Sequence, residues 1–103
     1  MAADAWESPA GTADAPLVPA RRGQRLVGFS CREAVAAAAA AAFVLRHGQS
    51  AGGRPLLYVN LAADESVRDW YGPQGINCPQ GVYVDRESGT TEVVVYVAGP
   101  EGP

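Results

Sequence analysis

Residues 92–98 read EVVVYVA, and this stretch decides the fold class. Successive side chains of a strand point to opposite faces, so the odd-numbered valines occupy one face while Val94, Tyr96 and Ala98 occupy the other. A strand that is apolar on both faces is typical of the middle of a sheet that a second layer covers. The segment therefore predicts a central strand in a domain of two layers.

Similar runs of β-branched and aromatic residues, separated by turn signals, extend upstream to residue 26. The predicted strands are Leu26 to Cys31, Ala41 to His47, Leu56 to Leu61, Val67 to Tyr71, Gly81 to Asp85 and Glu92 to Ala98. Strands with this spacing predict a mainly β fold, a small antiparallel β-sandwich or jelly-roll-like domain over residues 26–98.

The connectors carry specific turn chemistry. Gly72-Pro73-Gln74-Gly75 and Cys78-Pro79-Gln80-Gly81 each place proline second and glycine fourth, as type I turns prefer. Ser88-Gly89 predicts a hairpin loop that joins residues 82–85 to residues 92–97.

Residues 31–47 fit two structures. Ser30-Cys31-Arg32-Glu33 is a capping box and residues 36–42 are all alanine, which favours a helix. The segment has no charged face, however, and Phe43-Val44-Leu45 brings strand-type residues immediately before a glycine turn. The local sequence leaves helix and strand open.

Residues 1–25 are expected to form an extended N-terminal arm, and residues 99–103 a short C-terminal tail. Up to Gln24 the segment is mostly Ala, Pro, Gly and acidic residues, with Trp6 as its one aromatic residue and Leu17-Val18 as its aliphatic pair. Such a composition does not order itself, and ordering costs about 1–2 kcal/mol per residue in backbone entropy. A partner is therefore expected to hold the arm.

The length, net charge and apolar runs of the chain argue against several classes of protein. The 103 residues allow one domain, and a net charge of −3 disfavours nucleic acid as a partner, although all eight cations are arginine. No secretory signal is visible, and the longest apolar run, Ala34 to Leu45, is too short to span a bilayer. We expect a soluble protein that is intracellular at synthesis and has no membrane partner.

The ionisable residues give little support for catalysis or cofactor binding. His47 is the single histidine, and a triad drawn with Ser66 or Cys78 and Asp69 lacks any local signature. Cys31 and Cys78 offer too few zinc ligands, and reduced thiols are favoured over a disulfide between them, which stays open. We expect no enzyme activity, no cofactor and no metal.

Two carboxylate pairs could assist a calcium site. Asp64-Glu65 and Asp85 with Glu87 lie in predicted loops, but the spacing of an EF-hand is absent. Solvated turns are the favoured interpretation of both pairs.

Candidate protein-interface residues lie in the arm and in the loop after residue 69. Trp70 and Tyr71 are adjacent on a strand, so one is expected in the core and the other outside as a binding hot spot. The arginine cluster suits an acidic protein surface better than nucleic acid. The candidates are Trp6, Leu17, Val18, Arg21, Arg22, Arg25, Trp70, Tyr71 and Pro73. Stacking of a sugar on an exposed aromatic residue is not supported, because the sequence shows no neighbouring polar residues that would give such a site its specificity.

Four stretches, together with the alanine run, resemble small structural proteins of tailed actinobacterial phages and prophages. They read LVGFSCRE over residues 26–33, VLRHG over 44–48, DWYGPQG over 69–75 and GVYVD over 81–85. The resemblance covers Leu26 to Val97 and implies a compact β-sandwich, with Ala36 to His47 as strand. The length of the alanine run and the two cysteines depart from that pattern, which keeps the helix alternative open.

The resemblance implies a non-enzymatic virion structural subunit: a capsid decoration or cement protein, or another head or tail accessory subunit. Its expected partners are the major capsid protein or another virion protein and further copies of itself, in the virion and in the host cytoplasm during assembly. The alternative is a soluble β-sandwich module that recognises carbohydrate or a protein receptor. A third hypothesis is a nucleic-acid binder that works through the arginine cluster.

Overall fold

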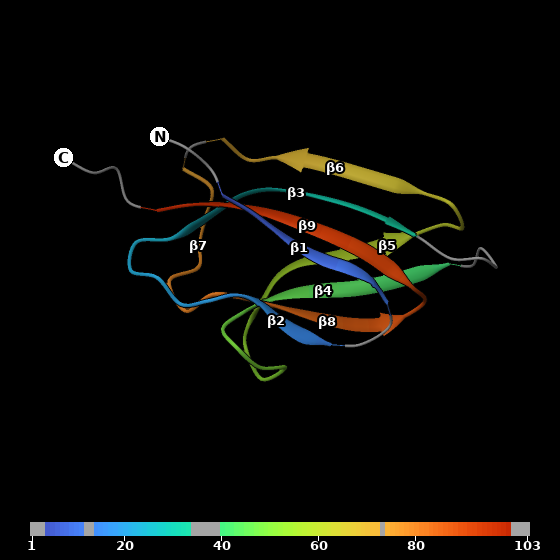
Figure 1. Ribbon diagram of the computed structural model, residues 1–103, viewed down its shortest axis with the longest axis horizontal. Coiled ribbons are helices and arrows are strands. Elements are labelled where there is room, and N and C mark those ends of the chain that lie inside the picture. Colours follow the sequence, from blue (N-terminus) through green and yellow to red (C-terminus); the bar gives the residue numbers. More distant parts are fainter. Residues whose placement is uncertain (1–3, 12–13, 34–39, 73, 100–103) are drawn as a thin grey trace.

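The computed structural model of the chain describes residues 4–11, 14–33, 40–72 and 74–99. Two antiparallel β-sheets pack into one sandwich, and these residues include no helix. Figure 1 shows one layer with β6, β3 and β9 above a second layer with β4, β8 and β2. The prediction of a small, mainly β sandwich is confirmed.

Nine strands make up the described part of the chain. In chain order they are β1 (Asp4–Gly11), β2 (Ala15–Val18), β3 (Arg25–Glu33), β4 (Ala41–His47), β5 (Pro55–Leu61), β6 (Ser66–Trp70), β7 (Ile76–Asn77), β8 (Val82–Ser88) and β9 (Thr91–Ala98).

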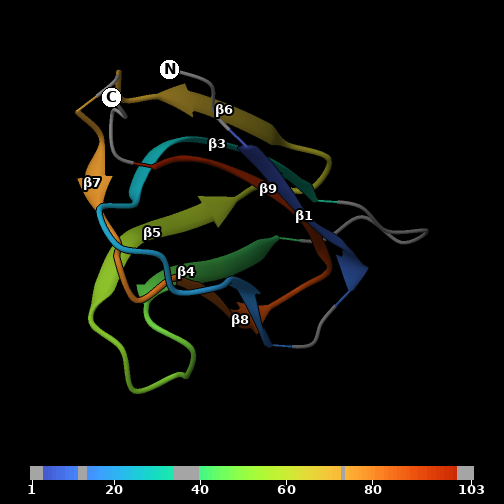
Figure 2. The ribbon, with the colours of Figure 1, turned by 60° about the vertical axis from the view of Figure 1, so that its left-hand side comes forward.

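The strands form two sheets, here called sheet A and sheet B. Sheet A has the order β1-β9-β3-β6, and the short β7 also pairs with β3; sheet B has the order β2-β8-β4-β5. Figure 2 shows β6 as the outermost strand of sheet A. Since β9 lies between β1 and β3, the prediction that residues 92–98 form a central strand is confirmed.

The core lies between the two sheets. Val93, Val95 and Val97 of β9 are fully buried, whereas Val94 and Tyr96 on the outer face are half-buried. Sheet B contributes fully buried aromatic and aliphatic side chains, namely Phe43, Leu45, Val82 and Val84. Burying one such side chain stabilises the fold by about 1.5–3 kcal/mol, so the two layers are held chiefly by these alternating positions.

The predicted hairpin between residues 82–85 and 92–97 is wrong. β8 belongs to sheet B and β9 to sheet A, so the connector at Gly89–Thr90 carries the chain from one layer to the other. Val84 and Val93 both enter the core, so the two strands face each other across the sandwich instead of lying side by side. A short glycine-containing loop serves either geometry, which is why its residues did not distinguish them.

The expected N-terminal arm is corrected by the structure. β1 pairs with β9 and β2 pairs with β8, so the segment supplies one edge strand to each sheet of its own domain. Val18 is 1% exposed within the core. Backbone pairing and this burial offset the ordering cost that composition alone suggested was too high. Residues 1–3 and 12–13, and the expected tail from residue 100, lie outside the described residues.

The open choice between helix and strand resolves to strand where the structure describes it. Residues 31–33 end β3, and β4 runs from Ala41 to His47 between β5 and β8. Ala41, Phe43 and Leu45 are buried in the core, an alternation that a helix could not make. The remainder of the alanine run, residues 36–39, lies outside the described residues.

The turn predicted at residues 78–81 is confirmed, because the Gly81 amide donates a hydrogen bond of 3.0 Å to the carbonyl of Cys78. Gly81 has φ +100°, and a Cβ there would collide with the Val18 carbonyl, so the position requires glycine. In the preceding turn, Gly75 also has positive φ, while Pro73 lies outside the described residues.

Candidate functional site: sheet edges and the outer face of sheet A

Three large hydrophobic side chains are exposed in the described part of the chain, and all three lie on edge strands. Trp6 of β1 is 37% exposed, Trp70 of β6 is 62% exposed and Tyr58 of β5 is 70% exposed. β1 and β6 are the two edges of sheet A, and β5 is an edge of sheet B. The aromatic surface of the molecule therefore gathers where strands lack a neighbour.

Trp70 and Tyr71 point in opposite directions, as predicted. Trp70 is the exposed member, whereas Tyr71 packs against the core with its ring 6.3 Å from that of Phe29. Burial and the neighbouring Asp69 raise the pKa of Tyr71 to about 12. The Tyr71 amide donates a 2.7 Å hydrogen bond to the carbonyl of Val27. Of the two candidates, Trp70 alone is largely accessible to a partner.

The other apolar candidates differ in accessibility. Trp6 faces Val95 in the strand register at the open side of β1, so part of its ring is accessible. Leu17 packs against the core, and Val18 is inside it. Val18 therefore offers no accessible surface in this fold, and an interface role for it stays a prediction. Pro73 lies outside the described residues.

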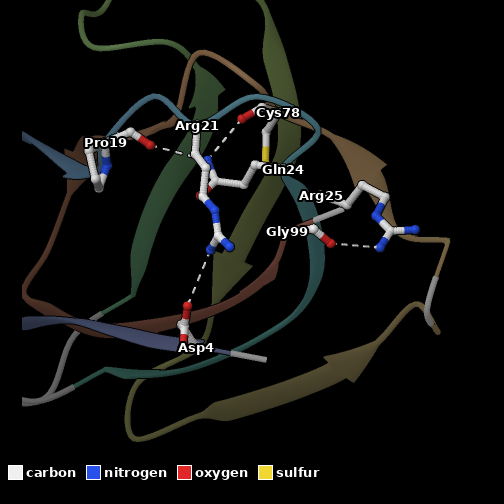
Figure 3. Close-up of polar contacts among 7 residues, drawn as sticks. All are labelled: Asp4, Pro19, Arg21, Gln24, Arg25, Cys78 and Gly99. Atoms are coloured by element: carbon white, nitrogen blue, oxygen red, sulfur yellow. Dashed lines mark hydrogen bonds and ion pairs between the residues drawn. The ribbon is translucent and has the colours of Figure 1, made fainter. Parts of the chain in front are cut away.

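Two of the three arginine candidates, Arg21 and Arg25, contact groups of their own chain (Figure 3). Arg21 forms an ion pair with Asp4 at 3.5 Å, and Nη2 of Arg25 donates to the carbonyl of Gly99 at 3.0 Å. Between them, Gln24 is buried and donates through Nε2 to the carbonyls of Pro19 and Cys78. Arg22 is exposed. That these arginines also meet an acidic partner surface stays a prediction.

The outer face of sheet A is ordered by strand register into three rows of side chains. The first row runs across β6, β3, β9 and β1 as Trp70, Gly28, Tyr96 and Ala5. The second row is Arg68, Ser30, Val94 and Glu7. The third row contains Ser66, Arg32 and Glu92. Partners in register point to the same face, so these residues share one surface.

Trp70 leans over Gly28. A Cβ at position 28 would lie 2.9 Å from Cε3 of the indole and 2.8 Å from the Asp69 carbonyl, so only glycine leaves room for the ring. Gly28 is accordingly buried although it faces outward. The second and third rows are hollowed. One hollow is lined by Ser30, Cys31, Ser66, Val67 and Arg68, and a second, which shares Ser30, Cys31 and Ser66 with it, also by Arg32, Glu92 and Val94.

Sequence reasoning missed this surface. The signal was present as alternate small and polar residues, Gly28, Ser30 and Arg32, opposite the core residues of the same strand. Their neighbours on β6 and β9 depend on register, however, and register is not visible in one strand alone.

An ion pair between Arg46 of β4 and Asp85 of β8 lies on the outer face of sheet B. Nε of Arg46 lies 2.8 Å from Oδ2 of Asp85, and both side chains are mostly buried. Nη1 of Arg46 also donates to the carbonyl of Gly53 at 3.1 Å, which ties the loop after β4 to this face. These contacts of Arg46 therefore stabilise this face of the domain.

The residues of the hypothetical triad have other contacts. Nε2 of His47 accepts a 3.1 Å hydrogen bond from the Gln80 amide, and burial with nearby Arg54 lowers the pKa of His47. Cys31 and Cys78 are free and buried, and burial raises the pKa of each thiol to about 11. Such thiols are poor nucleophiles at neutral pH.

Among the residues that the structure describes, no three His, Cys, Asp or Glu side chains gather as metal ligands would. Nor does that part of the chain contain a helix long and apolar enough to cross a membrane. Comparisons of the chain with models of protein families, with curated proteins and with solved structures found no match.

Proposed function

We propose that the protein is a non-enzymatic structural subunit that docks onto neighbouring proteins through the edges of its two sheets. The neighbour proposed is the major capsid protein or another protein of a phage virion, to which the subunit adds as a decoration or accessory component. Further copies of the chain are the second proposed partner.

The observation that carries the proposal is the position of Trp6, Tyr58 and Trp70 on edge strands. An edge strand presents unpaired backbone N–H and C=O groups, and monomeric proteins usually protect such edges with proline or with charged residues, lysine above all. This chain has no lysine, and although its edge strands carry charged residues such as Arg68 and Asp69, β1, β5 and β6 each also expose an aromatic side chain. Each aromatic ring can bury about 150–250 Å² against a partner, with little conformational entropy to lose.

The choice of a virion partner rests on the resemblance of residues 26–97 to small phage structural proteins. The β-sandwich agrees with the fold which that resemblance implies. The N-terminal strands change the earlier picture of docking: the partner meets β1 as the edge of a folded sheet, with Trp6 presented there, and does not order a free arm.

Co-sedimentation with phage particles from the source of the chain tests the proposal. The Trp6→Ala, Tyr58→Ala double variant should bind at least about tenfold more weakly, because losing two interface aromatics commonly costs more than about 1.4 kcal/mol. Tyr83→Ala is the matched control, since Tyr83 is a tyrosine on the inner strand β8 of sheet B. Equal binding by the double variant and the parent would show that the edges are not the docking surface.

Mass spectrometry of the same particles tests the virion assignment separately. The chain is expected among the particle proteins at a fixed ratio to the major capsid protein. If particles lack it, the virion partner is wrong. Sedimentation velocity of the purified chain then shows whether its edges bind further copies, because the parent would self-associate and the double variant would not.

A further inference from the structure

The outer face of sheet A combines an aromatic platform with a polar hollow. The platform is the indole of Trp70 on β6, which lies over Gly28 of β3 and remains 62% exposed. The hollow begins one row away, lined by Ser30 of β3 and by Ser66 and Arg68 of β6 among others. We define the sheet A site as six side chains: Trp70, Ser30, Ser66 and Arg68, with Arg32 and Glu92 at the far end.

The distance between platform and hollow is set by the strand. Trp70 and Arg68 are two residues apart on β6 and point the same way, as do Gly28 and Ser30 on β3. Two residues of a strand span about 6.6–7 Å. A ligand ring of sugar size that rests on the indole therefore reaches the hydroxyl of Ser30 and the guanidinium of Arg68 with its substituents.

The hydrogen-bonding groups of the site are both donors and acceptors. Ser30 and Ser66 hydroxyls do both, the Arg68 guanidinium donates, and the Glu92 carboxylate accepts. Nε of Arg32 holds Oε1 of Glu92 at 3.0 Å, which fixes that carboxylate at the end of the hollow. Arg68 is exposed and has no ion-pair partner among the described residues, so its donors are available.

The charges of the face balance. Arg32 and Arg68 are opposed by Glu92 and Glu7, and Glu7 occupies the same row as Arg68. These four side chains sum to zero charge, so the face has no excess of cations to favour a phosphate, and the whole chain has a net charge of −3.

We propose that the sheet A site binds a neutral pyranose of an oligosaccharide. The apolar C–H face of the sugar ring packs on the Trp70 indole, whose face carries partial negative charge. The ring hydroxyls, each a donor and an acceptor, point along the strands into the hollow at Ser30, Ser66 and Arg68. This is a second binding function, and it does not rest on docking through the sheet edges.

Binding to a panel of cellopentaose, mannopentaose and chitopentaose, followed by amide and indole NMR shifts, tests the proposal. At least one of the three should shift the Trp70 indole together with the amides of Ser30, Arg68 and Val94. The parent chain suffices for this measurement, so it does not depend on a variant that folds. If none of the sugars shifts these signals at about 10 mM, far above useful affinities, the proposal is overturned.

Variants then locate the ligand. Trp70→Ala should weaken binding of the responding sugar about tenfold by removing the platform. Ser30→Leu fills the hollow and should have a similar effect, while both side chains are accessible enough for the fold to tolerate the change. Tyr58→Ala removes an aromatic ring of sheet B that is 70% exposed, against 62% for Trp70, and should change binding less than about twofold.

The remaining outcomes separate the site from other ligands and from edge docking. Tighter binding of oligothymidylate or of a polyproline peptide at the same residues would overturn the sugar assignment. Shifts centred on Tyr58 would overturn the location. Ser30→Leu should leave co-sedimentation with particles unchanged, because Ser30 lies on the inner strand β3 and on neither edge strand of sheet A.

Discussion

His47 is neutral when it performs its structural role, since Nε2 must accept the hydrogen bond from the Gln80 amide. Its own amide donates to the Arg54 carbonyl at 2.8 Å, so the residue connects the loop after β4 to the turn before β8. Protonation removes the acceptor and places a charge beside Arg54, which already lowers the pKa of His47.

We therefore predict that the free energy of unfolding falls as the pH drops below about 6.5, the usual histidine pKa. The folded pKa is lower than the unfolded one, so the unfolded chain binds more protons in this window and gains in relative stability. Urea unfolding at pH 7.5 and pH 5 measures the effect. His47→Gln should make the two values more similar, and an unchanged difference in that variant would assign the pH dependence to other groups.

Cys31 and Cys78 make the stability of the fold depend on pH in the alkaline range. Burial raises both thiol pKa values to about 11, above the ordinary value of 9.0, so the folded state favours the protonated thiols. Their contribution is complete below pH 9 and is lost as the pH rises to 11. We predict a decline in the free energy of unfolding over this range, less steep in a Cys31→Ala, Cys78→Ala variant. Tyr71, with its pKa near 12, leaves part of the slope in place.

Besides their backbone pairing, the N-terminal strands contact Arg86 of β8. Its side-chain Nη2 donates to Oγ of Ser8 at 2.8 Å and to the carbonyl of Thr91 at 2.9 Å, and its backbone amide donates to Oδ1 of Asp14 at 2.6 Å. These contacts join β1, the segment before β2, and β9, so both sheets meet at this residue.

Arg86→Met should lower the free energy of unfolding by roughly 2–4 kcal/mol, because hydrogen bonds to a charged group each contribute about 1.5–3 kcal/mol. Arg68→Met is the matched control: it removes an exposed arginine with no ion pair in the described residues and should change stability by less than about 0.5 kcal/mol. Guanidinium titrations of both variants give the comparison. Equal stability of the two would mean that Arg86 is not the connection between the layers.

Elements differed in how far the sequence predicted them. β3, β5, β6, β8 and β9 were predicted because β-branched and aromatic residues recur along them, whereas the alanine run left β4 open between helix and strand. β1 and β2 were not predicted, since their alanine, proline and acidic residues have low strand propensity; they are strands because β9 and β8 offer them a paired edge. Tertiary context overrides local preference at these two positions.

The candidate site shows the same limit. The opposite orientations of Trp70 and Tyr71 follow from their adjacency on a strand and were predictable. That Trp70 lies over Gly28, beside Ser30 and opposite Tyr96, depends on the register of three strands that are far apart in the sequence. No local pattern encodes that register, so the polar neighbours of the indole could not be anticipated.

At the scale of the whole molecule, chain order and spatial order differ almost everywhere. Among the described strands, β4 with β5 is the one pair of hydrogen-bonded neighbours that are also consecutive in the chain. β1 pairs with β9, and β2 with β8, across most of the length of the chain. Loop-closure entropy must therefore be overcome before most contacts form.

We predict slow folding for a domain of this size, in the millisecond-to-second range typical of sandwiches with mostly non-local pairing. Stopped-flow refolding followed by tryptophan fluorescence measures the rate. Val95→Asp should prevent folding altogether by placing an unpaired charge where the parent side chain is fully buried. Microsecond folding, or a Val95→Asp variant with the spectrum of the parent, would contradict this topology.

The antiparallel pairing of β1 with β9 also determines how the domain bears mechanical load. Asp4 lies opposite Val97, so the outer ends of these strands leave sheet A at the same point. A force that separates the two ends pulls across the strands and opens their backbone hydrogen bonds one after another, starting with this pair. Unlike strands loaded in shear, which break all their bonds together, β1 peels away at low force. If a partner instead holds the domain at β6, the force passes from β6 to its neighbour β3 and does not act first on the pair of β1 and β9.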